Sequence, residues 1–177
     1  PNAAYEAVKT ALEVGYRHID CAAIYKNEAE VGDALTDAFE AGVADRGDVW
    51  VTSKLWNDAH APEHVRPALE QTLHDLQLDT LDLYLIHWPV AFTHGTDYPA
   101  STDEFVSLDE VPLADTWAAL EELKADGLVR HIGVSNFNIP KLQHLIDVGD
   151  VMPEMNQIEL HPYLQQPDLL SFADEQG

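Results

Sequence analysis

Side chains able to do acid–base chemistry collect near the expected carboxyl ends of the strand-like segments. Asp20 ends the first such segment, Lys54 lies near the end of the second, and His87 lies near the end of the third. Tyr25 falls in the loop just after the first segment. If parallel strands close into a barrel, these ends converge on one mouth, where catalytic groups sit. The spacing therefore predicts a site where a carboxylate, a phenol, an ammonium group and an imidazole meet.

Each of the four residues also has a purely structural interpretation. Asp20 is a residue type that caps turns, and an isolated lysine such as Lys54 is usually a solvated charge. His87 stands directly before a Trp-Pro pair, a setting typical of a buried histidine, and Tyr25 is equally typical of a surface aromatic. The residue types alone leave these alternatives open.

The elements that must position these residues alternate between two hydrophobic periods. Asn27 and Glu30 predict a helix cap with a carboxylate at the third helical position, and residues 90–111 are expected to form an irregular loop. About five strands and six helices in alternation predict a parallel α/β sheet, in one domain over residues 1–177. Helical spacing marks residues 5–12, 31–39, 65–76, 117–123, 142–146 and 169–173, and strand-like runs cover residues 17–20, 49–55, 81–88, 129–134 and 155–160.

The absence of glycine-rich phosphate motifs bears on the choice between two parallel α/β folds. A doubly wound sheet usually carries a Gly-rich first turn, and neither a Gly-x-Gly pair nor a P-loop pattern occurs in the sequence. Periodicity and this absence together favour a barrel, though only modestly.

The charge of the chain is strongly acidic. Asp and Glu number 32 against nine Lys and Arg, which gives a net charge of −23. Nucleic-acid binding is disfavoured because phosphate contacts need clustered cations, and no apolar run approaches the roughly 20 residues of a membrane helix. We expect a folded acidic surface adapted to a salt-rich cytoplasm, where screening shortens the Debye length to about 3 Å at 1 M. A single cysteine, Cys21, excludes an internal disulfide and fits a reducing compartment.

Five segments together resemble the aldo-keto reductases, and they occur in that family's order across nearly the whole chain. The first signature is matched by residues 15–32 and the second by residues 132–137. The segments that deliver the catalytic Lys and His are matched by residues 52–56 and 86–89, and a later strand by residues 155–162.

The resemblance implies a nicotinamide-dependent reductase of aldehydes or ketones on a (β/α)8 TIM barrel. Tyr25 corresponds to the general acid, Lys54 to the cation that would lower the pKa of Tyr25, and Asp20 to the carboxylate that holds Lys54. His87 would bind and orient the carbonyl oxygen. Ordinary tyrosine has a pKa near 10, so the phenol and the cation are needed together.

The resemblance also assigns cofactor and substrate contacts. Ser135, Asn136 and Gln157 correspond to positions that hydrogen-bond the nicotinamide carboxamide. Ser135 or Asn136 could instead cap the following helix, as Asn138 could. Trp56 and Trp88 are expected to form apolar walls of the substrate pocket, with core packing as the alternative.

Further expectations concern the cofactor, the oligomeric state, metal binding, the completeness of the barrel and an alternative function. The cofactor is expected to be NADPH, with NADH left open, and the complete protein to be a monomer. A metal site at His60 and His64 is disfavoured because no third ligand is evident. The family's first strand and last two strands find no match here, so an incomplete barrel is expected, inactive by itself. A regulatory, cofactor-sensing binding subunit is the alternative function.

Overall fold

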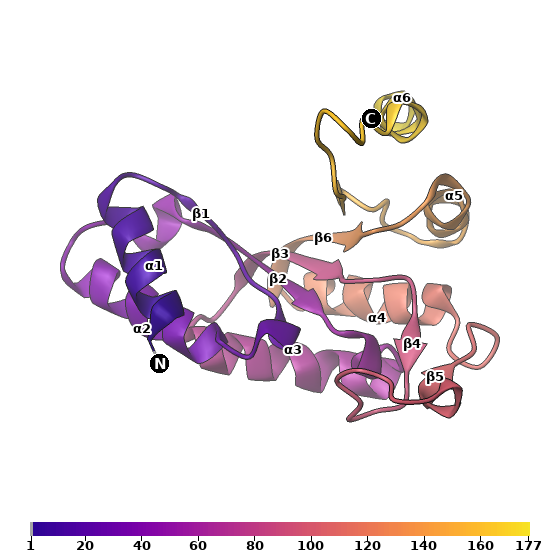
Figure 1. Ribbon diagram of the computed structural model, residues 1–177, viewed down its shortest axis with the longest axis horizontal. Helices are drawn as coiled ribbons and strands as arrows, with labels where there is room; N and C mark the ends of the chain where they lie inside the picture. The colour runs from indigo at the N-terminus through magenta and orange to yellow at the C-terminus, as the bar shows by residue number, and fades with distance from the viewer. Residues whose placement is uncertain (1) are drawn as a thin grey trace.

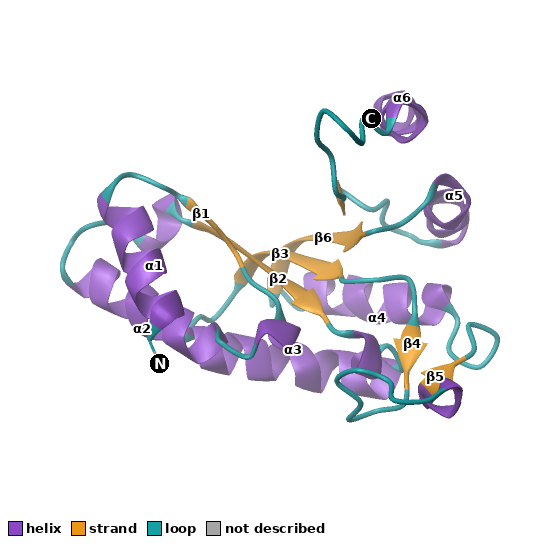
Figure 2. Ribbon diagram, viewed as in Figure 1, coloured by secondary structure: helices purple, strands orange, loops and turns teal. Residues whose placement is uncertain are grey.

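The computed structural model describes residues 2–177. Its centre is a parallel sheet of five strands, in the order β1 (His18–Asp20), β2 (Trp50–Leu55), β3 (Leu81–Ile86), β6 (Val129–Ser135) and β7 (Asn156–Gln157). Every neighbouring pair in this sheet is parallel. Figure 2 shows these strands side by side, with helices packed along the sheet. The sheet curls, so the chain forms five strands of a (β/α)8 barrel, as the sequence predicts.

Six α-helices lie among the described residues; four of them connect consecutive strands of the sheet, while the first precedes β1 and the last follows β7. Figure 1 shows helices packed along one side of the sheet. The six helices are α1 (Ala3–Glu13), α2 (Glu28–Glu40), α3 (Pro62–Leu76), α4 (Leu113–Ala125), α5 (Ile139–Val148) and α6 (Pro167–Gln176). Because side chains alternate across a strand, β2 and β3 turn Ser53 and Tyr84 to the helices and Lys54 and Leu85 to the opposite face. The main apolar core lies between the sheet and the helices.

A close approach of two helices fixes this layer. A Cβ atom added to Gly32 of α2 would lie 2.2 Å from the carbonyl oxygen of Asp75 in α3. Only glycine fits at that distance. The second glycine of the first signature is therefore explained by packing.

Three local expectations are correct only in part. Asn27 is the N-cap residue of α2 but its side chain makes no capping hydrogen bond. The carboxylate of Glu30 instead accepts from the backbone N–H groups of Asn2 and Ala4, because α1 begins beside it. The loop of residues 90–111 is not wholly irregular, since β4 (Ala91–Phe92) pairs antiparallel with β5 (Phe105–Val106).

The third correction concerns the last strand, which is shorter than the expected residues 155–160. Only Asn156–Gln157 pairs in β7, against the end of β6. The strand has a single neighbour in the sheet, so little backbone pairing holds the following residues extended.

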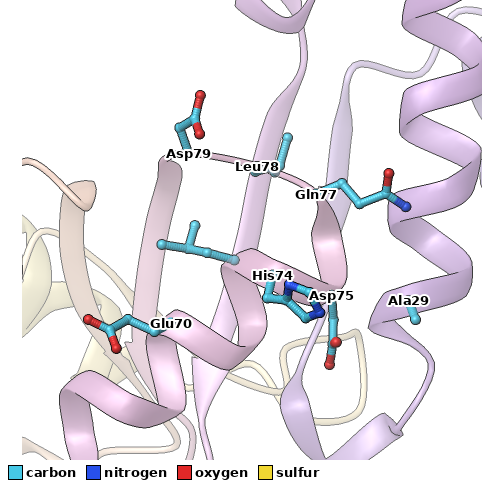
Figure 3. A pocket seen from close by; sticks show the side chains of 8 residues that line it. Ala29, Glu70, His74, Asp75, Gln77, Leu78 and Asp79 are labelled. Atoms are coloured by element: carbon cyan, nitrogen blue, oxygen red, sulfur yellow. The ribbon is translucent and has the colours of Figure 1, made fainter.

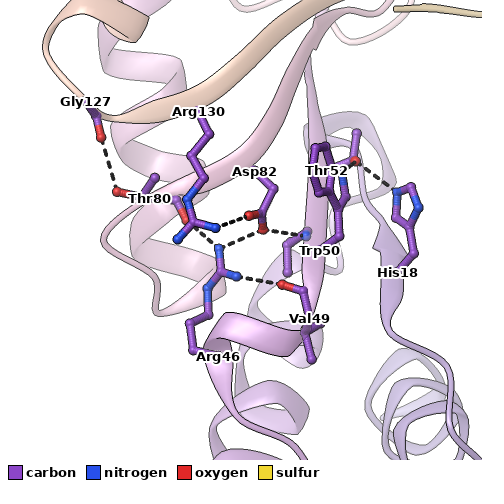
Figure 4. Close-up of polar contacts among 10 residues, drawn as sticks. His18, Arg46, Val49, Trp50, Thr52, Thr80, Asp82, Gly127 and Arg130 are labelled. Atoms are coloured by element: carbon purple, nitrogen blue, oxygen red, sulfur yellow. Dashed lines mark hydrogen bonds and ion pairs between the residues drawn. The ribbon is translucent and has the colours of Figure 1, made fainter.

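A buried ionic cluster closes the amino-terminal end of the strands (Figure 4). The Asp82 carboxylate, at the start of β3, accepts from Arg46 at 2.9 Å and from Arg130 at 2.7 Å. It also accepts from the backbone N–H of Val51 at 2.8 Å. The cluster joins three neighbouring strands and lies at the end opposite the predicted catalytic residues.

Candidate active site

A buried lysine and a half-exposed carboxylate form the centre of the site at the carboxyl ends of β1 and β2. The Lys54 Nζ atom donates to Asp20 Oδ1 at 2.7 Å and to the carbonyl oxygen of Cys21 at 2.8 Å. The Lys54 side chain is 2% exposed and that of Asp20 is 42% exposed. An isolated lysine at this depth would be costly, but the ion pair and the second hydrogen bond offset its desolvation. The structure therefore brings these two predicted residues into direct contact.

Tyr25 lies near this pair, and His87 lies next to Tyr25. The Tyr25 ring centroid is 5.7 Å from Lys54 Nζ and 6.1 Å from the His87 ring. Tyr25 belongs to a short 3-10 helix, Ala23–Tyr25, directly after β1, and half of its surface is exposed. All four residues predicted to be catalytic are thus gathered at one edge of the sheet.

The Tyr25 phenol titrates in the direction opposite to our expectation. Burial raises the pKa of Tyr25 above its ordinary value, and the negative charge of Asp20 raises it further. Lys54 does not reverse this effect, because Asp20 neutralises the ammonium group and itself lies close to the phenol. The net shift of the Tyr25 pKa is therefore upward, and the expected net lowering is wrong for this arrangement.

The His87 imidazole is held neutral by its surroundings. Burial lowers the pKa of His87 to about 4, and the charge of Lys54 contributes in the same direction. Its Nδ1 atom is buried without a hydrogen-bond partner among residues 2–177. A neutral ring keeps one N–H as a donor, so His87 can bind an oxygen without carrying charge.

The predicted cofactor residues form one network at the ends of β6 and β7. Asn136 Nδ2 donates to the carbonyl oxygen of His87 at 3.0 Å and to Ser135 Oγ at 3.1 Å. Ser135 Oγ donates to the Gln157 carbonyl oxygen at 2.8 Å. Asn136 has φ +62°, a left-handed conformation that Asn tolerates better than most residues. Asn138, not Ser135 or Asn136, caps α5.

The two tryptophans expected in the pocket border His87. Trp56 meets the His87 ring edge-on at 5.1 Å, and Trp88 stacks beside it at 6.5 Å. Trp56 is half-buried and Trp88 more exposed. Both therefore line the mouth rather than the main core, where the alternative interpretation placed them.

The loop between β4 and β5, part of residues 90–111, adds two contacts to the site that the sequence does not indicate. The Trp56 indole N–H donates to the Asp97 carbonyl oxygen at 2.8 Å, and Tyr98 meets Trp56 edge-on at 5.8 Å. These contacts span about forty residues, and the loop has no regular hydrophobic period that would have indicated them.

Two other features carry no site for this chemistry. Within residues 2–177, no three His, Cys, Asp or Glu side chains are grouped as a metal site; His60 is buried, and His64 stacks on His94 at 3.7 Å. A surface hollow between α2 and α3 (Figure 3) is lined by acidic residues and by none of the predicted catalytic ones.

None of the helices described is long and apolar enough to span a bilayer.

Comparison with known proteins identifies the family. The sequence profile of the aldo/keto reductase family matches residues 1–177. The chain belongs to the aldo/keto reductase family. Over 177 residues it is 53% identical to an aldo/keto reductase of Synechocystis, covering 54% of that protein. It is 49% identical over 179 residues to human aldo-keto reductase family 1 member A1, covering 55% of it.

Solved structures agree with this assignment. The aldose reductase of Schistosoma japonicum matches all of the chain with a TM-score of 0.94 and 44% identity, over 60% of its own length. A Bombyx mori aldo-keto reductase in complex with NADP matches 98% of the chain with a TM-score of 0.89 and 39% identity, over 53% of its length. The chain thus spans about half the length of the curated relatives it matches. The fold is an incomplete form of the TIM barrel of these relatives.

Proposed function

We propose that the protein reduces aldehydes or ketones with NADPH and that Tyr25 donates the proton. The observation that carries this proposal is the meeting of Tyr25, His87 and the Lys54–Asp20 pair at one edge of the sheet. The Bombyx mori relative was solved with NADP, which favours NADPH over NADH. The ligand is then a small-molecule carbonyl compound, and we propose a monomer in a reducing cytoplasm, where the free Cys21 stays a thiol.

The residues at the ends of β6 and β7 fit a nicotinamide carboxamide. The Gln157 side-chain amide has no hydrogen-bond partner among residues 2–177, and the same holds for Asn136 Oδ1, whereas Ser135 and Asn136 Nδ2 already bond within the network. A carboxamide offers both a donor and an acceptor, so Asn136 Oδ1 and Gln157 would hold it, with Ser135 fixing Asn136. When bound, the reduced cofactor supplies a hydride.

The reaction at the substrate then needs a proton and an oriented oxygen. The neutral His87 ring donates a hydrogen bond to the carbonyl oxygen and sets its direction. As a C–H bond forms at the carbonyl carbon, the oxygen takes the proton from Tyr25 Oη, so the carbonyl becomes an alcohol and Tyr25 a phenolate. Lys54 stabilises that phenolate, and solvent reprotonates it because Tyr25 is 52% exposed.

The raised pKa of Tyr25 suits this role in the direction of reduction. A proton donor must be protonated before the reaction, and a tyrosine with a pKa above its ordinary value near 10 stays protonated throughout the physiological range. Lys54 reduces the cost of forming the phenolate, while burial and the charge of Asp20 keep the net pKa above its ordinary value.

The test needs a protein with a closed sheet, which we call the completed barrel. It contains residues 1–177 together with the remaining strands, taken from the native reading frame where it supplies them or from the unaligned part of the Synechocystis relative. Tyr25→Phe should lower kcat by about 10²–10⁴ and leave the Kd for NADPH unchanged, because the phenol acts in the transition state. NADPH oxidation with a series of aldehydes and fluorescence titration measure the two quantities.

Two outcomes would contradict the proposal. A Tyr25→Phe protein that keeps even about a tenth of kcat rules out Tyr25 as the acid. NADPH binding without oxidation by any carbonyl compound would instead support a cofactor-sensing subunit. Residues 1–177 alone should show no turnover, because β1 and β7 each leave one edge unpaired; a folded, active chain of this length would contradict that expectation.

A further inference from the structure

A charged contact links the two loops that border the proposed pocket. Lys26, directly after Tyr25, forms an ion pair with the Asp97 carboxylate across 71 residues of sequence. Asp97 also accepts the Trp56 indole N–H through its carbonyl oxygen at 2.8 Å. One residue therefore ties the loop between β4 and β5 to the segment that carries the proposed proton donor and to a pocket wall.

Tyr98, the next residue, stands over the same mouth. Its ring meets Trp56 edge-on at 5.8 Å, and 70% of its surface is exposed. Trp56 in turn meets the His87 ring edge-on at 5.1 Å, so Tyr98 lies one ring away from the residue proposed to orient the carbonyl oxygen. An exposed aromatic ring next to a pocket wall offers apolar area that a bound substrate can cover.

The backbone at Lys26 indicates that its side chain matters. Lys26 has φ +54°, in the left-handed region, where a side chain brings strain that glycine avoids. Lysine is also scarce, with five residues in a chain of net charge −23. A strained position is occupied by a rare cation whose ammonium group reaches the neighbouring loop.

The far side of this loop is anchored separately. The Asp58 carboxylate accepts from Gly95 N–H at 3.1 Å, and His94 Nδ1 lies 3.0 Å from the Asp58 carbonyl oxygen. Loss of Lys26 would therefore loosen only the side of the loop that faces Tyr25. The fold should survive the substitution.

We infer that Lys26 and Asp97 form a clasp that positions Tyr98 as a substrate-binding wall, selective for carbonyl compounds with an aromatic group. The inference rests on the proposed carbonyl reduction. Lys26 and Asp97 are positioning residues that touch neither the reacting atoms nor the cofactor. A small polar aldehyde does not extend to Tyr98, so the clasp should affect aromatic aldehydes alone.

Three variants and one control test the clasp in the completed barrel. Lys26→Gln removes the charge, and Lys26→Gly removes both charge and backbone strain. The pair Lys26→Asp with Asp97→Lys exchanges the charges, and Asp tolerates the left-handed backbone. Arg66→Gln removes another exposed ion pair, with Asp126, which includes no residue of the β4–β5 loop or of the predicted site.

The first measurement is independent of turnover. Amide hydrogen exchange over residues 93–106 should become faster in Lys26→Gln and Lys26→Gly, return towards the wild-type rate in the exchanged pair, and stay unchanged in Arg66→Gln. Lys26→Gly should be at least as stable as Lys26→Gln, so faster exchange there cannot be attributed to global unfolding. Unchanged exchange in Lys26→Gln would overturn the clasp.

The second measurement separates KM from kcat at low ionic strength, where exposed charges are least screened. KM for benzaldehyde should rise by up to about fivefold in Lys26→Gln, the most that an exposed ion pair supplies, with kcat nearly unchanged. KM for glyceraldehyde should not change. An equal rise for both aldehydes, or no recovery in the exchanged pair, would overturn the selectivity. A wild-type protein that reduces no aldehyde overturns the proposed function and this selectivity, while the exchange result still decides whether the clasp holds the loop.

Discussion

The two ends of the same strands hold buried charges in contrasting ways. At the amino-terminal end, Asp82 is 2% exposed and both its oxygens accept hydrogen bonds, from two arginines and a backbone N–H. At the carboxyl end, Lys54 is as deeply buried, but its partner Asp20 remains half in water, and His87 Nδ1 is buried without a partner among the residues described. A network in which every polar group is paired stabilises the fold. A network with unpaired polar groups keeps donors and acceptors for a ligand.

The contrast shows why buried charge alone does not identify an active site. The Asp82 cluster has no exposed reactive group, so nothing in it can change protonation state cheaply. The Lys54 cluster adjoins a half-exposed phenol and a neutral imidazole, both with pKa values shifted by burial. Shifted pKa values next to an opening are typical of functional sites.

Replacement of Lys54 should lower activity strongly while it changes stability little, the largest such difference among the variants considered. Lys54→Met removes the cation that stabilises the Tyr25 phenolate, so kcat of the completed barrel should fall by about 10² or more. Stability should change by only about 1 kcal/mol, because Met fills the space and Asp20 stays solvated. Steady-state kinetics and urea unfolding measure the two effects. A Lys54→Met protein with near-wild-type kcat would remove the basis for distinguishing the two ends.

Replacement of Asp82 should have the opposite profile. Asp82→Ala leaves Arg46 and Arg130 without their shared partner and the buried Val51 N–H without an acceptor. The free energy of unfolding should fall by about 3 kcal/mol, as for other broken buried pairs. Activity per folded molecule should persist. If kcat instead falls with stability unchanged, the amino-terminal cluster takes part in function after all.

The unsatisfied groups of the carboxyl end should also make the fold sensitive to acid. His60, just after β2, is buried with neither ring nitrogen bonded within residues 2–177, and burial lowers its pKa to about 4. The unfolded chain binds this proton at a pKa near 6.5. Stability from the neutral ring is therefore complete above about pH 6.5 and is lost as the pH falls towards 4, by about 3 kcal/mol in total.

Urea unfolding at a series of pH values measures this slope. His60→Leu places an apolar side chain of similar size at this position and removes the titrating group. The stability of the variant should therefore depend less on pH over the same interval. An identical slope in the variant would mean that other groups, His87 among them, dominate the acid sensitivity of this end.

The positions of the catalytic candidates could be predicted because the residues around a strand end are enough to locate it. Asp20 ends one strand-like run, Lys54 lies near the end of the next, and His87 follows the apolar run of residues 81–86. Parallel alternation brings such strand ends together. Long-range contacts could not be predicted. The Lys26–Asp97 pair, the partner of Glu30 and the β4–β5 hairpin depend on how distant loops meet. Our prediction of the direction of the Tyr25 pKa shift was wrong for the same reason, because the shift depends on burial and on charges from several segments of the chain.

The smallest expected effect is that of salt on stability, and it concerns the acidic surface of the whole chain rather than either end of the sheet. At a net charge of −23, carboxylates repel one another in dilute buffer, and the Debye length falls to about 3 Å at 1 M salt. Exposed pairs such as Arg66–Asp126 weaken under the same screening, but each contributes at most about 1 kcal/mol. Relief of repulsion should therefore prevail, and 2 M KCl should raise the Tm of the completed barrel by about 3 °C or more, since 1 kcal/mol corresponds to roughly 2–4 °C at this size.

A matched variant distinguishes charge repulsion from a general effect of salt. Glu70 and Asp79 are exposed acids that border the hollow between α2 and α3 (Figure 3), and neither contacts the proposed site. Glu70→Gln with Asp79→Asn removes two negative charges, so it should raise Tm in dilute buffer and reduce the gain from KCl. Because the Asp82 carboxylate is buried, salt screens it less than the surface acids, so Asp82→Ala should lose most of the same stability in both buffers even though Arg130 is half-exposed. A Tm that is unchanged or lowered by KCl in the parent protein would contradict the salt-adapted surface.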